Sequence, residues 1–159
     1  MKNLLACLAL LSIGALAAGC EQASLESTVQ EYLDSKNITP SDCGSVDLGK
    51  ECPANAPMPS TGPAPAPIQC FLDAYTNCKA ARLSLTQPTV EGDPIYSVYI
   101  VVPGQACSIE QIVDSREDNF GDKAITKSSC TSPSGEGTCA SPLGLNDCTA
   151  NCGSGSDCG

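Results

Sequence analysis

The chain has no histidine and no tryptophan among its 159 residues, and its aromatic side chains are limited to four tyrosines and two phenylalanines. Without histidine it cannot form a Ser-His-Asp triad, a Cys-His pair or a histidine-ligated metal centre. Basic residues are also scarce, since eight lysines and arginines oppose 18 acidic residues and give a net charge of −10. This balance disfavours binding to nucleic acid and to anionic lipid surfaces. We therefore expect no nucleic-acid partner.

Cysteine is the residue type in excess, with 12 copies. Such a density in a short chain is typical of a disulfide framework formed in an oxidising compartment. A thiol oxidoreductase would need C-x-x-C, but the closest spacing is Cys148-x-x-x-Cys152. The spacings do not suit structural zinc either, so we predict no metal and no other cofactor. Ten cysteines are the disulfide candidates: Cys43, Cys52, Cys70, Cys78, Cys107, Cys130, Cys139, Cys148, Cys152 and Cys158.

Residues 1–19 have the form of a signal peptide. A basic start is followed by an apolar run of about 13 residues, from Leu4 to Leu16, which is too short to span a bilayer. The run ends in Leu16-Ala17-Ala18-Gly19-Cys20, which resembles the lipobox of bacterial lipoproteins. The resemblance implies cleavage before Cys20, a diacylglyceryl group on its thiol and a fatty acyl group such as palmitate on its amine. An ordinary secretory signal cut after Ala15-Leu16-Ala17 is the alternative.

Cysteine parity favours the lipoprotein interpretation. Cleavage after Ala17 or Ala18 leaves eleven cysteines and hence one unpaired thiol, whereas lipidation of Cys20 leaves ten that can all pair. Glu21 follows Cys20. An aspartate at this position would resemble the signal that retains lipoproteins in the inner membrane of enteric bacteria, and Glu21 is not an aspartate. We therefore expect a lipid-anchored protein of the bacterial envelope, located in the outer membrane. Its partners would be the membrane, through Cys20, and a protein of the envelope or the extracellular space.

The segment 20–52 is expected to hold a helix followed by a cysteine loop. Apolar residues recur at helical spacing over 24–36, with Ser24 or Ser27 as the N-cap, and turn-forming residues follow over 37–52. Six prolines within 53–67 favour an extended linker.

The region 68–130 reads as a small α+β domain. A helix is expected over 68–81, followed by strands at 82–86, 95–102 and 107–113 and a weaker one at 124–128. These elements predict a helix followed by an antiparallel meander of three to four strands, with the apolar run 95–102 at its centre.

The remaining residues, 131–159, form a tail rich in cysteine, glycine and serine. The pattern C-x-S-P-x-G-x-x-x-C occurs at 130–139 and again at 139–148, and each copy carries a type I turn signature. Because apolar residues are sparse after Cys130, we expect 130–159 to form a unit separate from the α+β domain, with mostly internal disulfides.

Several clusters could carry chemistry, but none predicts a catalytic residue. The acidic cluster between Asp114 and Asp122 could hold calcium, although a solvated turn is favoured because Arg116 stands among its ligand positions. Glu110 and Asp114 could form an acid–base pair, but a glycosidase would need aromatic walls. We expect a non-enzymatic lipoprotein with a surface-binding or envelope-structural role. The alternative is a regulator of a secreted or envelope enzyme, such as a protease inhibitor.

Overall fold

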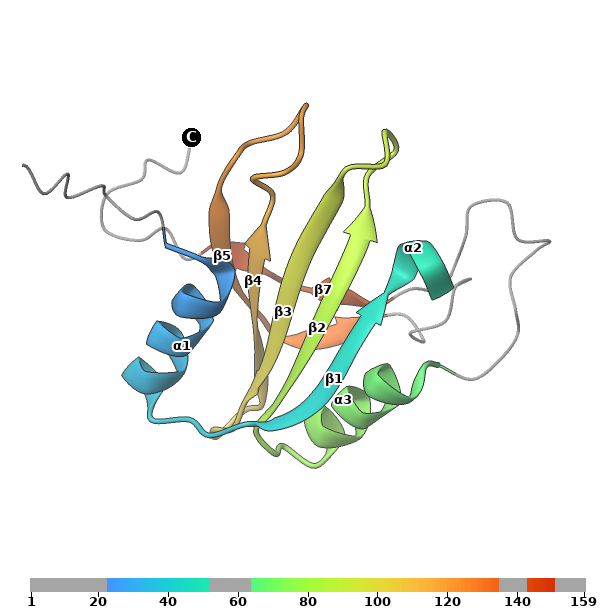
Figure 1. Cartoon of the computed structure of the whole chain (residues 1–159). Helices are drawn as coiled ribbons and strands as arrows, with labels where there is room; N and C mark the ends of the chain where they lie inside the picture. Colours follow the sequence, from blue (N-terminus) through green and yellow to red (C-terminus); the bar gives the residue numbers. More distant parts are fainter. Residues whose placement is uncertain (1–22, 52–63, 135–142, 151–159) are drawn as a thin grey trace, which may run out of the picture.

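A six-stranded sheet organises the part of the chain that the computed structural model describes, which covers residues 23–51, 64–134 and 143–150 (Figure 1). The strand order is β1-β2-β3-β4-β5-β8, in which β1 and β2 are parallel and every other pair is antiparallel. The strands are β1 (Ser41–Asp47), β2 (Ala81–Pro88), β3 (Pro94–Val102), β4 (Ser108–Asp114), β5 (Ile125–Cys130) and β8 (Thr149–Ala150). The α+β class is confirmed, but the sheet has more strands than the three to four expected.

The helix α1 (Leu25–Lys36) covers one face of the sheet. It begins where expected, because the Ser24 side chain accepts a hydrogen bond from the backbone N–H of Ser27, and it ends at Asn37, which is in the left-handed conformation. Two buried side chains, Val29 and Leu33, pack against apolar residues of β3 and β4, namely Val98, Ile100 and Ile112.

The helix α3 (Ala66–Thr76) covers the opposite face. Ile68 and Phe71 are buried against residues of the sheet that alternate with those under α1: Leu83, Leu85, Tyr99, Val101 and Ile109. The helix is shorter than the expected 68–81, since it ends at Thr76 and Cys78 has a positive φ of 48°. Cys78 therefore lies in the turn that leads into β2 rather than on the helix.

The segment 37–52 was expected to form turns, but it contains β1 and the short helix α2 (Leu48–Glu51). Val46 is the one fully buried side chain of β1, so the strand lacks the alternation of apolar residues that would have revealed it. Its ladder with β2 also shifts register between Asp42 and Ser45. Within that irregularity Gly44 has a φ of 95°, and its N–H donates to the Asp42 carboxylate.

The four predicted strands are present as β2 to β5. As expected, β3 lies inside the sheet between β2 and β4, and residues 97–101 are buried. Hairpin pairing of consecutive strands gives the meander its local topology.

The described part of the C-terminal segment joins the domain, which differs from the separate unit that we expected. β8 pairs with β5, and β7 (Gly144–Asn146) pairs with β6 (Ser132–Ser134) as a second, two-stranded sheet. Leu143 is buried in the core beneath α3, with Leu145 packed against it. The few large apolar residues of this segment are therefore used to attach it to the sheet.

Candidate functional site

Three disulfides join the elements of the described domain. Cys43 on β1 bonds Cys70 on α3, and Cys78 after α3 bonds Cys107 before β4. The third bond joins Cys130 at the end of β5 to Cys148 before β8, so both partners belong to the C-terminal segment. It joins the first and last cysteines of the tandem pattern rather than closing one copy. The other predicted sites lie outside the described residues: Cys20, Cys52, Cys139, Cys152 and Cys158.

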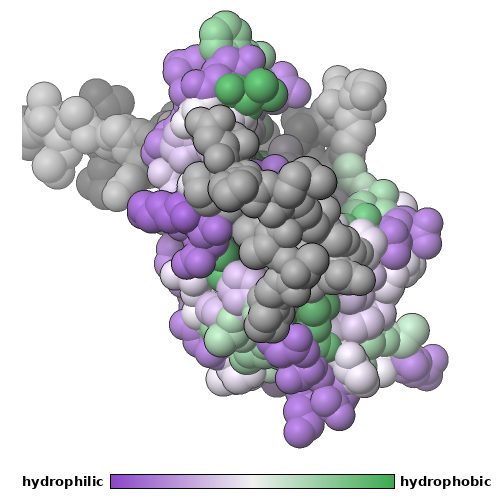
Figure 2. Space-filling model, turned by 90° about the vertical axis from the view of Figure 1, so that its right-hand side faces the viewer, coloured by the Kyte–Doolittle hydropathy of each residue, from purple (hydrophilic) through white to green (hydrophobic). Residues whose placement is uncertain are grey.

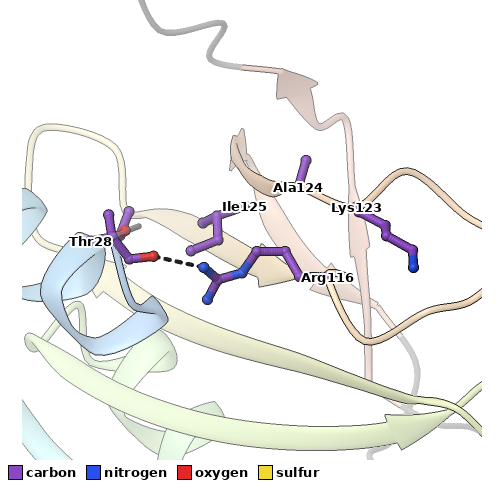
Figure 3. Close-up of a pocket in the computed structure, with 6 residues that line it drawn as sticks. Thr28, Arg116, Lys123, Ala124 and Ile125 are labelled. Carbon is purple, nitrogen blue, oxygen red and sulfur yellow. Dashed lines mark hydrogen bonds between the residues drawn. The ribbon is translucent and has the colours of Figure 1, made fainter. Parts of the chain in front are cut away.

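A cavity of about 280 Å³ lies where the N-terminal end of α1 meets the connection between β4 and β5 (Figure 3). Its lining residues come from those two segments: Ala23, Thr28, Arg116, Lys123, Ala124 and Ile125. The Arg116 side chain reaches toward the start of α1, whereas Lys123 points away from it (Figure 3). The cavity thus lies between the segment that leads into α1 and the β4–β5 connection.

Arg116 connects three parts of this region. Its Nε and Nη2 donate to the two carboxylate oxygens of Asp114 at 2.8 and 2.6 Å. Its Nη1 donates to the backbone carbonyl of Ala23 at 2.9 Å. The hydrogen bonds from Arg116 hold the pKa of Asp114 below its usual value. Because its donors are engaged in this way, Arg116 holds Ala23, which precedes the N-cap of α1, against the sheet.

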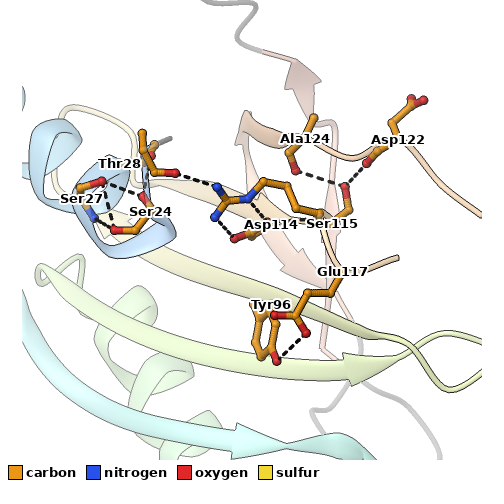
Figure 4. Close-up of polar contacts among 11 residues, drawn as sticks. Ser24, Ser27, Thr28, Tyr96, Asp114, Ser115, Glu117, Asp122 and Ala124 are labelled. Atoms are coloured by element: carbon orange, nitrogen blue, oxygen red, sulfur yellow. Dashed lines mark hydrogen bonds and ion pairs between the residues drawn. The ribbon is translucent and has the colours of Figure 1, made fainter. Parts of the chain in front are cut away.

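The β4–β5 connection, residues 115–124, contains several hydrogen bonds, and Figure 4 shows those of Ser115. The Ser115 hydroxyl donates to the carbonyls of Asp122 and Ala124, and the Asp118 carboxylate accepts from the backbone N–H of Phe120. At the base of the connection, the Tyr96 hydroxyl donates to the Glu117 carboxylate at 3.3 Å. These contacts give the connection a defined conformation.

The β4–β5 connection also binds the neighbouring β2–β3 hairpin. The backbone N–H and the side-chain amide of Asn119 donate to the two carboxylate oxygens of Asp93, both at 3.0 Å. Within the hairpin, the backbone N–H of Asp93 donates to the Thr89 hydroxyl, and the backbone N–H of Thr89 donates to the Asp93 carbonyl. The two connections therefore form one hydrogen-bonded unit at one end of the sheet.

A second polar cluster lies beneath α1. Glu110 is only 3% exposed and accepts from the Ser129 hydroxyl at 2.6 Å. Burial and the neighbouring Glu110 carboxylate, to which Tyr32 is hydrogen-bonded, raise the pKa of Tyr32 to about 12. Nearby on the same face, Arg82 of β2 forms a bidentate ion pair with Glu26 of α1 at 2.9 and 3.1 Å. These contacts fix α1 to the sheet in addition to its apolar face.

The acidic residues named from the sequence are used within the fold. Glu110 and Asp114 both lie on β4, but the first is bound by Ser129 and the second by Arg116. The calcium hypothesis has no assembled ligand set here, because the described residues include no group of three or more side chains suited to hold a metal.

The contacts that define this region could not be read from motif spacing. Arg116 and Ala23 are 93 positions apart, and Tyr32 and Glu110 come from different elements.

Comparison of the chain with protein-family models, curated proteins and solved structures gave no match. No helix within the described ranges has the length and hydrophobicity needed to cross a membrane.

Proposed function

We propose that this protein is an exported bacterial lipoprotein with a non-enzymatic, surface-binding or envelope-structural role. The observation that carries the proposal is the set of three disulfides that link β1, α3, β4, β5 and the C-terminal segment. Such bonds persist in exported proteins and are rare in the reducing cytosol. They support an extracytoplasmic location, and the segment Leu16–Cys20 supplies the resemblance to a lipobox.

The start of the described domain suits a short lipid tether. Ala23, which follows Cys20 by three residues, is held by Arg116, and Ser24 caps α1. A diacylglyceryl group together with an amine-linked acyl chain binds membranes stably, whereas a single chain does so only marginally. In this proposal the protein lies in the outer membrane, with the domain held close to the bilayer surface and its loops available to an envelope or extracellular protein.

The test is mass spectrometry of the N-terminal peptide, together with fractionation of the producing cells. A lipidated peptide beginning at Cys20 and recovery with the outer membrane would support the proposal. The Cys20→Ala variant should be released or should retain its signal segment, and the matched variant Cys43→Ala should stay with the membrane. An unmodified peptide beginning at Ala18 or Gly19 would show that the protein is secreted without a lipid.

A regulatory role is the alternative function and needs a separate assay. A protease inhibitor protects its enzyme at stoichiometric concentration. Titration of the purified protein against a panel of secreted serine and cysteine proteases should therefore leave their activity unchanged. Stoichiometric loss of activity with any of them would favour the regulatory function over the structural or binding one.

A further inference from the structure

We propose that the end of the sheet formed by the β2–β3 hairpin and the β4–β5 connection faces the membrane, and that Val90 and Phe120 insert into the interfacial layer of a zwitterionic bilayer. We call this end the loop end and define it as residues 89–93 and 115–124. The inference deepens the proposed function and rests on lipidation of Cys20.

The loop end carries both large hydrophobic side chains that are exposed among the described residues. Val90 is fully exposed and Phe120 is 79% exposed, although large apolar side chains are normally enclosed in a core. Both connections project from the same end of the sheet (Figure 1). Figure 2 shows hydrophobic groups among hydrophilic ones at that upper end of the molecule. A pair of protruding apolar side chains is suited to entering a lipid interface.

The loop end is organised before any contact is made. Asn119 donates two hydrogen bonds to Asp93, and Phe120 is held by its N–H bond to Asp118. Loops that are already ordered lose little conformational freedom on binding, so more of the transfer free energy of the apolar side chains is retained. The two side chains would therefore enter the bilayer together, as parts of one rigid unit.

The position of Ala23 brings the proposed anchor to the same end. Arg116 lies two residues after the end of β4. Its side chain donates to the Ala23 carbonyl at 2.9 Å. Cys20 precedes Ala23 by three residues, which span at most about 11 Å when extended. Lipid on Cys20 would thus hold the bilayer close to the base of the loop that carries Phe120. The turn between β3 and β4 lies a full strand away, roughly 23 Å for the seven residues of β4.

The charges of the loop end select the kind of bilayer. Five acidic residues lie in its two connections, against the two basic residues Arg116 and Lys123: Glu91, Asp93, Glu117, Asp118 and Asp122. Carboxylates are repelled by an anionic lipid surface but carry little electrostatic penalty beside headgroups of zero net charge. Insertion should therefore be strongest in zwitterionic lipid and weaken as the anionic fraction rises. A basic protein surface would fit the same charges, but it would produce no insertion into protein-free vesicles.

The absence of tryptophan provides the test, because a single introduced tryptophan is the only one in the protein. The lipidated full-length mature protein would be reconstituted into phosphatidylcholine vesicles with Phe120→Trp, Val90→Trp or the control Gln105→Trp. Gln105 is exposed in the β3–β4 turn at the opposite end. We expect a blue shift, protection from aqueous quenchers and quenching by brominated lipid for the first two variants, and none of these for the control. Replacing part of the lipid by phosphatidylglycerol should reduce the shift.

The outcomes separate the inference from the anchor on which it rests. Mass spectrometry of the same preparations establishes whether Cys20 carries lipid. If Cys20 carries no lipid, the proposed lipid anchor is wrong, and the inference that the loop end faces the membrane is wrong as well. If Cys20 is lipidated but both loop tryptophans stay as accessible to aqueous quenchers as the control, the inference is wrong and the anchor stands. Circular dichroism checks each variant, and Val90→Trp alone decides the matter if Phe120→Trp does not fold.

Discussion

Reduction of the disulfides is the perturbation to which the described domain should be most sensitive. The Cys43–Cys70, Cys78–Cys107 and Cys130–Cys148 bonds close loops with sequence separations of 27, 29 and 18 residues. On the chain-entropy account, loops of these lengths stabilise the folded state by about 3–4 kcal/mol each. Their combined effect is about 10 kcal/mol, which is comparable to the whole stability of an ordinary domain, roughly 5–15 kcal/mol. Full reduction should therefore bring the domain close to unfolding at room temperature.

The contribution of single bonds can be separated with paired variants. Replacing Cys43 and Cys70 together by alanine should lower the free energy of unfolding by about 3 kcal/mol and the melting temperature by roughly 10–15 °C. Loss of the Cys130–Cys148 bond should cost at least as much despite its shorter loop, because Cys130 is 2% exposed and its truncation also leaves a cavity. The matched variant Ser45→Ala, at an exposed position on β1, should change stability by less than about 0.5 kcal/mol.

The assay is thermal unfolding followed by near-ultraviolet circular dichroism, in parallel with thiol counting. Oxidised wild type, reduced wild type and the paired variants would be compared at the same pH. An unchanged melting temperature after thiol counting has shown complete reduction would refute the argument that a thin core depends on these bonds. A large loss for Ser45→Ala would show that β1 is sensitive to substitution for reasons other than its disulfide.

Three further predictions concern the polar contacts of α1 and β4. Arg116→Gln should destabilise the domain in chemical unfolding, because it leaves Asp114 and the Ala23 carbonyl without a charged donor. The pKa of Asp114 is lower in the folded state than its usual value of 3.8. The stability that the Asp114–Arg116 pair contributes is therefore present above about pH 4 and is lost as the pH falls through the folded-state pKa. Acid unfolding of Arg116→Gln should show a smaller dependence on pH in that range. Tyr32→Phe should remove one tyrosine that ionises near pH 12 from a spectrophotometric titration. It should also lower the free energy of unfolding by about 1–2 kcal/mol, because Glu110 loses a hydrogen-bond donor. An unchanged titration would show that another tyrosine accounts for that ionisation.

The elements that could be predicted from the sequence are those whose pattern reflects their own packing. In α1, Val29 and Leu33 are one helical turn apart and both are buried, so the helical periodicity predicted the face as well as the element. In β3, residues 97–101 are all buried, and the continuous apolar run predicted a strand inside the sheet. Hairpin connections then fixed the order of β2 to β5, because consecutive antiparallel strands usually pair.

The elements that escaped prediction depend on residues distant in the sequence. β1 has one fully buried side chain and a glycine with positive φ, and it becomes a strand through its parallel ladder with β2, which lies beyond α3. The C-terminal segment was expected to form a separate unit because it is polar, yet Leu143 is buried in the core and the Cys130–Cys148 bond joins the segment to the end of β5. Composition alone does not show where a single leucine will be placed.

The candidate site illustrates the same limit at the level of chemistry. Arg116 was noted in the sequence only as a residue that interferes with a calcium loop, because the signal available was its place between acidic residues. In the fold it binds Asp114, two positions before it at the end of β4, and Ala23, 93 positions away, so its local partner could be inferred and its distant partner could not. The distant contact is the one on which the proposed membrane orientation depends, because it holds Ala23, just before α1, beside the connection that exposes Phe120.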